Sequence, residues 1–202
     1  MKTRSARDEL LDFLKEKSVC RGAFTLASGA QSDLYIDARI TTCDPKGAIL
    51  VGRVGWEVVK QVARDLRCRI DSIGGLTMGA DPIALSIGIS AHLEDPSSEL
   101  QTFVVRKAAK THGRQKLIEG NFSAGHSVVI VDDVITTGGS TLQAIDAIEA
   151  AGGNIAFVIV LVDRQEGGRE NIETRGHKVV PIFTRADLIG ADARQRSHIA
   201  VA

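Results

Sequence analysis

The chain has 202 residues, of which 44% are hydrophobic and 25% are charged, a composition typical of a globular protein with a full core. Basic and acidic residues number 25 each, so the formal net charge is zero and a general attraction to nucleic acid or membrane surfaces is excluded. Aromatic residues, at 4%, are too few for a platform that stacks single-stranded bases. The length fits one domain over residues 1–202, in which any anion site must be local.

The N-terminal part predicts a small appendage. Leu10, Phe13 and Leu14 lie among charged residues, which predicts an amphipathic helix over residues 5–17. The segment FTLASGAQSDLYID, residues 24–37, is rich in Ser, Gly and β-forming residues and predicts two short strands around a turn. Acids inside the helical pattern argue against a secretory signal, and no apolar run approaches the ~20 residues of a membrane helix. We therefore expect a cytoplasmic protein.

The three cysteines, Cys20, Cys43 and Cys68, lie far apart in the sequence. Their odd number and the lack of a CxxC pair or a Cys/His cluster indicate neither a disulfide framework nor a zinc site. We expect reduced and mostly structural thiols, as is usual in the cytosol.

The rest of the chain alternates between helices and apolar strands. Asp44 and Pro45 are suited to begin a helix that runs to about Leu66. Further strands are expected at 70–73, 102–105, 127–131, 155–162 and 178–182, and further helices at 82–92 and 140–151. This alternation predicts an α/β fold, a parallel sheet flanked by helices on both faces, with the core over about residues 44–165. The appendage takes up about residues 1–43.

The most informative segment is VVIVDDVITTGGSTLQAI, residues 128–145. An apolar strand ends in the adjacent carboxylates Asp132 and Asp133, and a Thr/Gly loop then leads into a helix. Such a loop supplies unpaired N–H groups, hydroxyls and the positive end of the helix dipole, which together bind a phosphate. Gly138 and Gly139 let the backbone approach the anion, and the carboxylates suit sugar hydroxyls or a metal-bound water beside it. Neither GxxxxGK[ST] nor GxGxxG occurs, which disfavours an NTPase or a dinucleotide-binding protein.

A second segment, VVRKAAKTHGRQKLIEG at residues 104–120, concentrates positive charge. Its basic residues, against the single acid Glu119, are Arg106, Lys107, Lys110, His112, Arg114 and Lys116. The segment has no helical or strand periodicity and little apolar surface to bury, which predicts a mobile lid suited to a polyanionic ligand.

Two shorter segments follow predicted strands. The sequence GGLTMGADP, residues 74–82, predicts a second loop of backbone amides that can hold an anion. The sequence DRQE, residues 163–166, places Arg164 where its guanidinium can pair with a carboxylate.

Together these segments resemble the type I phosphoribosyltransferases, and more closely the orotate phosphoribosyltransferases. VVIVDDVITTGGST is similar to the ribose-phosphate motif of the whole family, whereas FTLASGAQSDLYID, the lid and DRQE are similar to the orotate-specific motifs. The resemblance covers residues 22–190. It implies transfer of the phosphoribosyl group of 5-phospho-α-D-ribosyl 1-diphosphate (PRPP) to orotate, giving orotidine 5′-monophosphate and pyrophosphate in de novo UMP biosynthesis. It also implies a type I fold with a small N-terminal hood completed by the C-terminal segment.

The resemblance further implies the roles of individual residues. PRPP would be bound by Arg106, Lys107, Lys110, His112, Asp132, Asp133, Thr136, Thr137, Gly138, Gly139, Ser140 and Thr141. Orotate would be bound by Thr136 and Arg164, and the pyrophosphate loop would be Leu76, Thr77, Met78 and Gly79. The catalytic residues would be Lys110, His112, Asp132 and Asp133, with either Lys110 or His112 as the general acid for the leaving group.

The family needs magnesium, which we expect PRPP and not the protein to hold, and acts as a homodimer whose lid reaches the neighbouring site. Some members carry lysines where this chain has Ala27 and Met78, so this enzyme relies more on its lid and metal. Two alternatives stay open: a phosphoribosyltransferase for another base, which DRQE and the lid disfavour, and a non-enzymatic PRPP sensor. The sensor is disfavoured because the chain has neither spare length nor a basic surplus for a nucleic-acid-binding domain.

Overall fold

A six-stranded sheet forms the centre of the protein, in a computed structural model that describes residues 4–25, 31–108 and 116–190. The strand order is β5-β4-β3-β6-β7-β8, and every neighbouring pair is parallel except β4 with β5. The strands are β3 (Ser72–Leu76), β4 (Gln101–Val105), β5 (Ile118–Gly120), β6 (Ser127–Ile135), β7 (Asn154–Asp163) and β8 (Val179–Thr184). The predicted α/β class with a mostly parallel sheet is confirmed.

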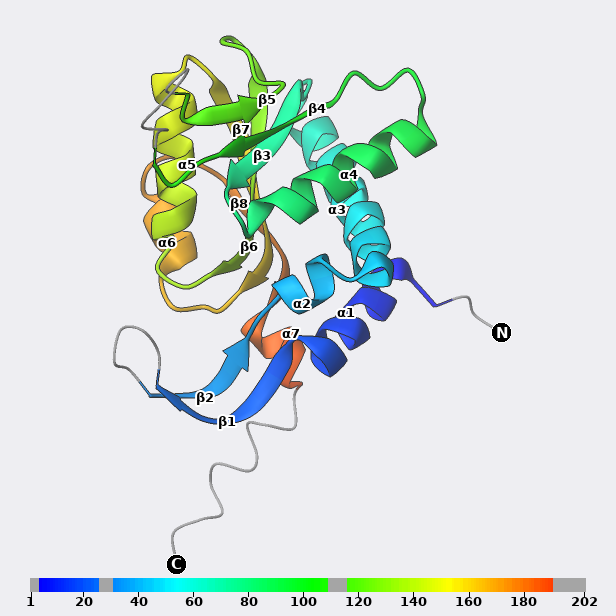
Figure 1. The fold of residues 1–202 in the computed structure, drawn as a ribbon, viewed down its shortest axis with the longest axis vertical. Helices are drawn as coiled ribbons and strands as arrows, with labels where there is room; N and C mark the ends of the chain where they lie inside the picture. The colour runs from blue at the N-terminus through cyan, green and yellow to red at the C-terminus, as the bar shows by residue number, and fades with distance from the viewer. Residues whose placement is uncertain (1–3, 26–30, 109–115, 191–202) are drawn as a thin grey trace, which may run out of the picture.

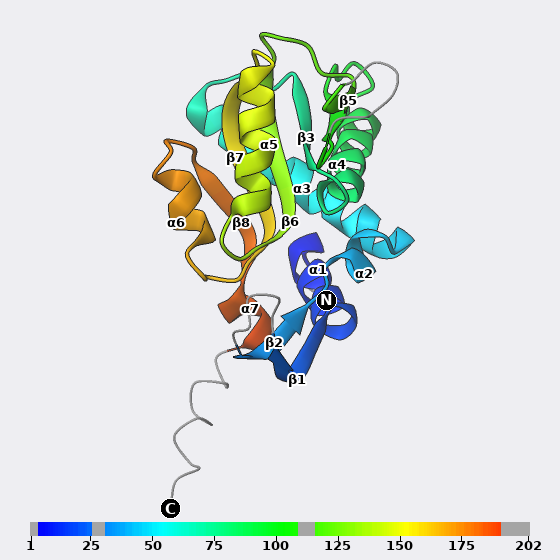
Figure 2. The same cartoon turned by 60° about the vertical axis from the view of Figure 1, so that its left-hand side comes forward.

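Helices cover both faces of this sheet (Figure 2). The helices α3 (Pro45–Leu66) and α4 (Ala80–Glu94) pack on one face, where Val51, Ile83 and Ile87 are buried against Val129 and Phe157. The helices α5 (Gly139–Ala150) and α6 (Gly168–Glu173) pack on the other face, over a second buried cluster. Burial on both faces explains why the central strands are almost continuously apolar.

The ends of the long helices follow the sequence signals. The Asp44 carboxylate accepts hydrogen bonds from the backbone N–H groups of Lys46 and Gly47, at 2.8 and 3.1 Å, and so caps α3. In the same way, the Ser5 hydroxyl accepts from the N–H of Asp8 at 3.1 Å and caps α1 (Ala6–Lys17). Both predicted helices are therefore confirmed.

The hood consists of α1, the antiparallel pair β1 (Val19–Thr25) and β2 (Gln31–Ile36), the short α2 (Arg39–Thr42), and α7 (Arg185–Ile189) from the end of the described chain. It lies at one end of the sheet (Figure 1). Arg7 connects α1 to the last strand, because its guanidinium donates to the Ile182 carbonyl at 2.9 Å and stacks on the Phe183 ring. Of the two strands predicted in residues 24–37, the second is present as β2, whereas its antiparallel partner β1 begins earlier than predicted, at Val19.

Strands β3 and β6 end later than the sequence predicts. Strand β3 includes Gly74 and Gly75, which we expected in a loop, and β6 continues through Asp132 and Asp133 to Ile135. These strand positions require glycine because neighbouring backbones lie too close for a side chain: a Cβ on Gly75 would lie 2.1 Å from the Val131 carbonyl oxygen. The extension of β6 comes from its pairing with β7, which continues to the end of that strand.

Other differences concern short elements and boundaries. The predicted lid ends in a strand, since β5 pairs antiparallel with β4 from Ile118 onward. The core also extends beyond residue 165, because β8 joins the sheet next to β7. Helices α2, α6 and α7 are too short, at four to six residues, to show a clear period. Cys20 and Cys43 are free but exposed, so the expectation of structural thiols is wrong for them.

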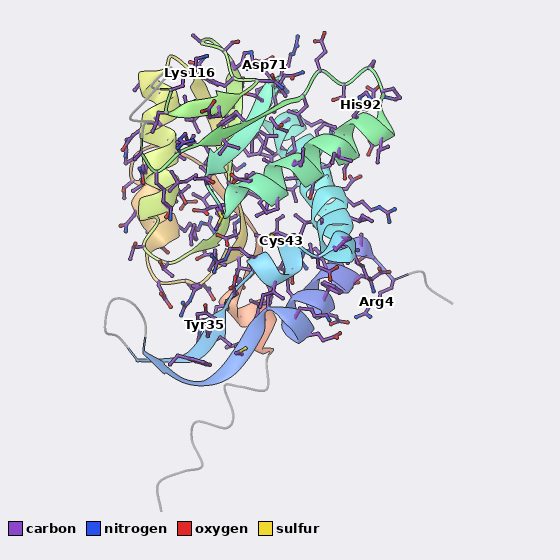
Figure 3. All side chains as sticks on the ribbon, in the orientation of Figure 1. Arg4, Tyr35, Cys43, Asp71, His92 and Lys116 are labelled. Carbon is purple, nitrogen blue, oxygen red and sulfur yellow. The ribbon has the colours of Figure 1, made fainter. Side chains whose placement is uncertain are left out.

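The carboxyl ends of the parallel strands point toward the hood. Figure 3 shows Asp71, which precedes β3, at one end of the molecule, and Tyr35 of the hood at the other. The carboxyl ends of β3, β6 and β7 therefore face the hood, the edge at which open parallel sheets bind ligands. No helix among the described residues is long and apolar enough to span a membrane.

Candidate active site

The Thr/Gly loop forms a concave site where β6 ends. A cavity of about 210 Å³ is lined by Asp132 and by residues 134–140. The loop leads directly into α5, and Gly138 takes a left-handed conformation with φ of 82° that favours glycine. The predicted phosphate-binding residues therefore lie together, next to the amino-terminal end of a helix of 12 residues.

Asp132 is buried beside this loop, with 6% of its surface exposed. One carboxylate oxygen accepts a hydrogen bond from the Thr141 hydroxyl at 2.6 Å, and the other accepts from the backbone N–H of Asp133 at 3.0 Å. Burial raises the pKa of Asp132 to about 7, and the neighbouring charge of Asp133 acts in the same direction. Near neutral pH this carboxyl therefore exists in both protonation states.

Asp133 is less buried than Asp132. One of its carboxylate oxygens accepts from the Val134 N–H at 2.9 Å. Burial raises the pKa of this carboxyl above its usual value, and the charge of Arg39 in the hood opposes the rise. The two adjacent carboxylates thus differ in environment, which suits Asp132 to a structural contact with Thr141 and Asp133 to contact with a ligand.

The loop predicted to bind pyrophosphate, Leu76 to Gly79, lies directly against Asp133. A Cβ on Gly79 would lie 2.4 Å from Oδ1 of Asp133, so only glycine fits there without a shift. The loop is held by the Thr77 N–H, which donates to the Val105 carbonyl at 2.8 Å, and by the Thr77 hydroxyl, which donates to Asp81 at 2.7 Å. Met78 is 66% exposed, and the peptide bond that precedes it is cis. The structure thus brings together two loops that are more than fifty residues apart in sequence.

Arg164 lies at the end of β7 and is 5% exposed. Its guanidinium pairs with Glu166 at 2.8 Å and donates to the Leu34 carbonyl of the hood at 3.5 Å. Its backbone N–H donates to the carbonyl of Ile135, the residue before Thr136, at 3.1 Å. The two residues predicted to bind orotate are therefore adjacent, between the sheet edge and the hood.

The start of the basic lid lies near α5. The Lys107 carbonyl accepts from the side-chain amide of Gln143 at 3.1 Å, and the Arg106 N–H donates to the Leu117 carbonyl at 2.9 Å. Lys110 and His112 lie outside the described residues, as does Ala27. The structure therefore describes Arg106 and Lys107 but neither of the two candidates for the general acid.

Sequence reasoning missed two contributions to the site. The segment after DRQE packs on the Thr/Gly loop: a Cβ on Gly168 would lie 2.4 Å from the Thr136 carbonyl oxygen. The paired glycines Gly167 and Gly168 were the available signal for such a close backbone approach. The charge of Arg39 near Asp133 left no signal in the sequence, because the hood and the sheet meet only in the folded chain.

The fold and the site define a phosphoribosyltransferase. A family profile described as the phosphoribosyl transferase domain matches residues 53–186. The orotate phosphoribosyltransferase of Mycobacterium leprae is 40% identical over 182 residues, which cover 90% of this chain and 96% of that protein. The orotate phosphoribosyltransferase of Streptomyces coelicolor is 44% identical over 167 residues, covering 83% of this chain and 87% of that protein.

Solved structures agree with these relatives. Mycobacterium tuberculosis orotate phosphoribosyltransferase in complex with Fe(III) dicitrate superposes with a TM-score of 0.76 at 38% identity, covering 91% of this chain and 99% of that one. The same enzyme in complex with PRPP gives a TM-score of 0.73 at 34% identity, covering 92% and 100%. The chain belongs to the phosphoribosyltransferase family and, within it, to the orotate phosphoribosyltransferases.

Proposed function

We propose that this protein transfers the phosphoribosyl group of PRPP to orotate and so forms orotidine 5′-monophosphate and pyrophosphate for de novo UMP biosynthesis. The observation that carries the proposal is the meeting of three features at one sheet edge. These are the Asp132–Asp133 pair, the Thr/Gly loop that begins α5, and the buried Arg164. They match the ribose, the phosphate and the base carboxylate of the product.

PRPP would bind through its 5′-phosphate to the loop from Thr137 to Thr141, where N–H groups, hydroxyls and the helix dipole favour an anion. The ribose hydroxyls would donate to Asp133, because both oxygens of Asp132 already accept hydrogen bonds from the protein. Asp132 in turn holds Thr141 in place. The carboxylates also favour the positive charge that develops on the ribose when the bond to pyrophosphate breaks.

Orotate would lie between the hood and the end of β7, with its carboxylate on Arg164. Its N1 loses its proton, which ends in bulk water, and forms the new bond to the anomeric carbon as the bond from that carbon to the pyrophosphate oxygen breaks. Arg106 and Lys107, together with Lys110 and His112 of the lid, would bind the leaving pyrophosphate, and one of the latter two would protonate it. Excluding water from this site prevents hydrolysis of PRPP.

The residues of the site are compatible with a magnesium ion that arrives with PRPP. Among the described residues, no group of three His, Cys, Asp or Glu side chains is placed to hold a metal ion. Mg²⁺ takes oxygen ligands and keeps several waters, so Asp133 would contact a metal-bound water and the phosphates would supply the direct ligands. When bound, the ion neutralises charge on the pyrophosphate.

The test is consumption of orotate by the purified protein with PRPP and magnesium, beside parallel reactions with uracil, hypoxanthine and adenine. Orotate should be converted far faster than the other three bases, because only orotate has a carboxylate for Arg164. Faster conversion of another base would identify a transferase with a different specificity. Binding of PRPP without conversion of any base would favour a PRPP sensor.

A homodimer in the cytoplasm is part of the proposal. Helix α4 exposes Leu85, Ile89 and Leu93, which are four residues apart and so form one apolar row on the surface. A second copy of the chain would cover this row and bring its lid to the neighbouring site. The free thiols of the three cysteines suit a reducing compartment.

The shared lid can be tested with two inactive variants. Lys110→Ala removes a lid cation and Asp133→Asn damages the ribose site, so a mixed dimer would contain one intact site if the lid acts across the interface. We expect the mixture to regain activity that neither variant has alone. No recovery, after subunit exchange has been verified by mass spectrometry, would show that each lid serves its own subunit.

A further inference from the structure

The start of α6 touches the Thr/Gly loop at residues 136–138, the proposed phosphate loop, with no side chain between the two backbones. A Cβ on Gly168 would lie 2.4 Å from the Thr136 carbonyl oxygen and 2.9 Å from the Gly138 nitrogen. Conversely, a Cβ on Gly138 would lie 2.8 Å from the Gly168 carbonyl oxygen. Helix α6 therefore supports the loop at a distance that only glycines allow, and none of its residues is among those that line the cavity.

One side chain of α6 adds a hydrogen bond to this contact. The side-chain amide of Asn171 donates from Nδ2 to the carbonyl oxygen of Thr137 at 3.0 Å. Helix α6 itself is fixed from beneath, because Ile172 is fully buried in the cluster that lies under α5. Asn171 thus connects the loop to an element with a fixed position.

The Thr137 carbonyl belongs to the same peptide plane as the N–H of Gly138. In a trans peptide these two groups point in opposite directions, so a hydrogen bond that fixes the carbonyl also fixes the N–H. Gly138 needs this support more than other residues, because glycine has the widest choice of backbone conformations and here has a φ of 82°. A loop that binds an anion through its N–H groups binds best when their directions are set in advance.

We propose that Asn171 is a positioning residue for the 5′-phosphate of PRPP: it holds the Thr137–Gly138 peptide in the orientation that binds the phosphate, without touching the ligand. This inference rests on the proposed function of the loop. It predicts that loss of the side-chain amide weakens binding of the phosphorylated ribose and leaves binding of pyrophosphate unchanged.

The variant Asn171→Ala tests the inference, and Asn154→Ala is its matched control. The Asn154 amide also donates to a backbone carbonyl, that of Gly125 at 3.3 Å, at the opposite end of β7 from the site. Alanine favours a helix more than asparagine does, so Asn171→Ala should not lower the melting temperature through α6 itself. A loss of affinity in this variant would therefore not reflect a general loss of structure.

The measurement is isothermal titration of the full-length protein with ribose 5-phosphate and, separately, with magnesium pyrophosphate. We expect Asn171→Ala to bind ribose 5-phosphate about two- to tenfold more weakly than wild type, the ratio that corresponds to one hydrogen bond. Its pyrophosphate affinity should match wild type, and Asn154→Ala should match wild type for both ligands. In steady-state assays KM for PRPP should rise by a similar ratio and kcat should change little.

Two results would overturn the inference: equal affinity of wild type and Asn171→Ala for ribose 5-phosphate, or an equal loss of affinity for both ligands. Failure of the proposed function has a different outcome. In that case wild type itself would not bind ribose 5-phosphate and would consume no orotate in the presence of PRPP and magnesium.

Discussion

Replacing Asp132 by asparagine tests whether this carboxyl is held partly protonated by its burial. The change keeps the shape of the side chain and its hydrogen bonds. The amide oxygen of the variant can still accept from the N–H of residue 133, and its NH₂ group can donate to the Thr141 hydroxyl, which is free to turn. The essential difference is that asparagine cannot ionise.

The expected change in the free energy of unfolding follows from the pKa of Asp132, which rises from 3.8 to about 7 on folding because the carboxyl is buried. The folded state binds the proton more tightly, so Asp132 stabilises the fold at low pH and this contribution is lost as the pH rises from 3.8 to about 7. At 1.36 kcal/mol per pKa unit, wild type should lose about 2–3 kcal/mol between pH 5 and pH 8 through this one group. Asp132→Asn should not show this loss.

Urea unfolding of both proteins without ligands, at one-unit steps from pH 5 to pH 8, gives the required free energies. Groups that titrate equally in both proteins cancel in the difference between wild type and variant. We expect that difference to change steadily in favour of Asp132→Asn, and to level off above pH 7. Parallel profiles for the two proteins over the whole range would refute the argument that burial controls the ionisation of Asp132.

Two further changes probe the ligand contacts. Arg164→Ala should raise KM for orotate about 10- to 100-fold, since a charge-assisted pair contributes about 1.5–3 kcal/mol. Arg169→Ala, at a half-exposed arginine that pairs with Glu173, should leave this KM unchanged. Equal effects of Arg164→Ala on KM for orotate and for PRPP would contradict a role in base recognition. Gly79→Ala places a methyl group where the Asp133 carboxylate lies and should lower kcat/KM for PRPP about tenfold, and an unchanged value would mean that the loop can move aside at little cost.

The sequence by itself determined the fold class and the chemical parts of the site. Hydrophobic periodicity revealed α1 and α3, and Asp44 and Pro45 marked the start of α3, because these signals act within a few residues of one another. The motif at residues 128–145 showed an anion loop next to two carboxylates for the same reason. DRQE and the lid added the resemblance that suggested orotate.

Only the tertiary structure decided how these parts meet. The ends of β3 and β6 were wrong because pairing partners distant in sequence extend a strand, and no local pattern contains that information. The pKa of Asp132 depends on burial under α5, and the contact of Gly79 with Asp133 depends on two loops that close on each other. The support of the phosphate loop by α6 arises in the same way, since Asn171 and Thr137 are 34 residues apart and meet only when the sheet has formed.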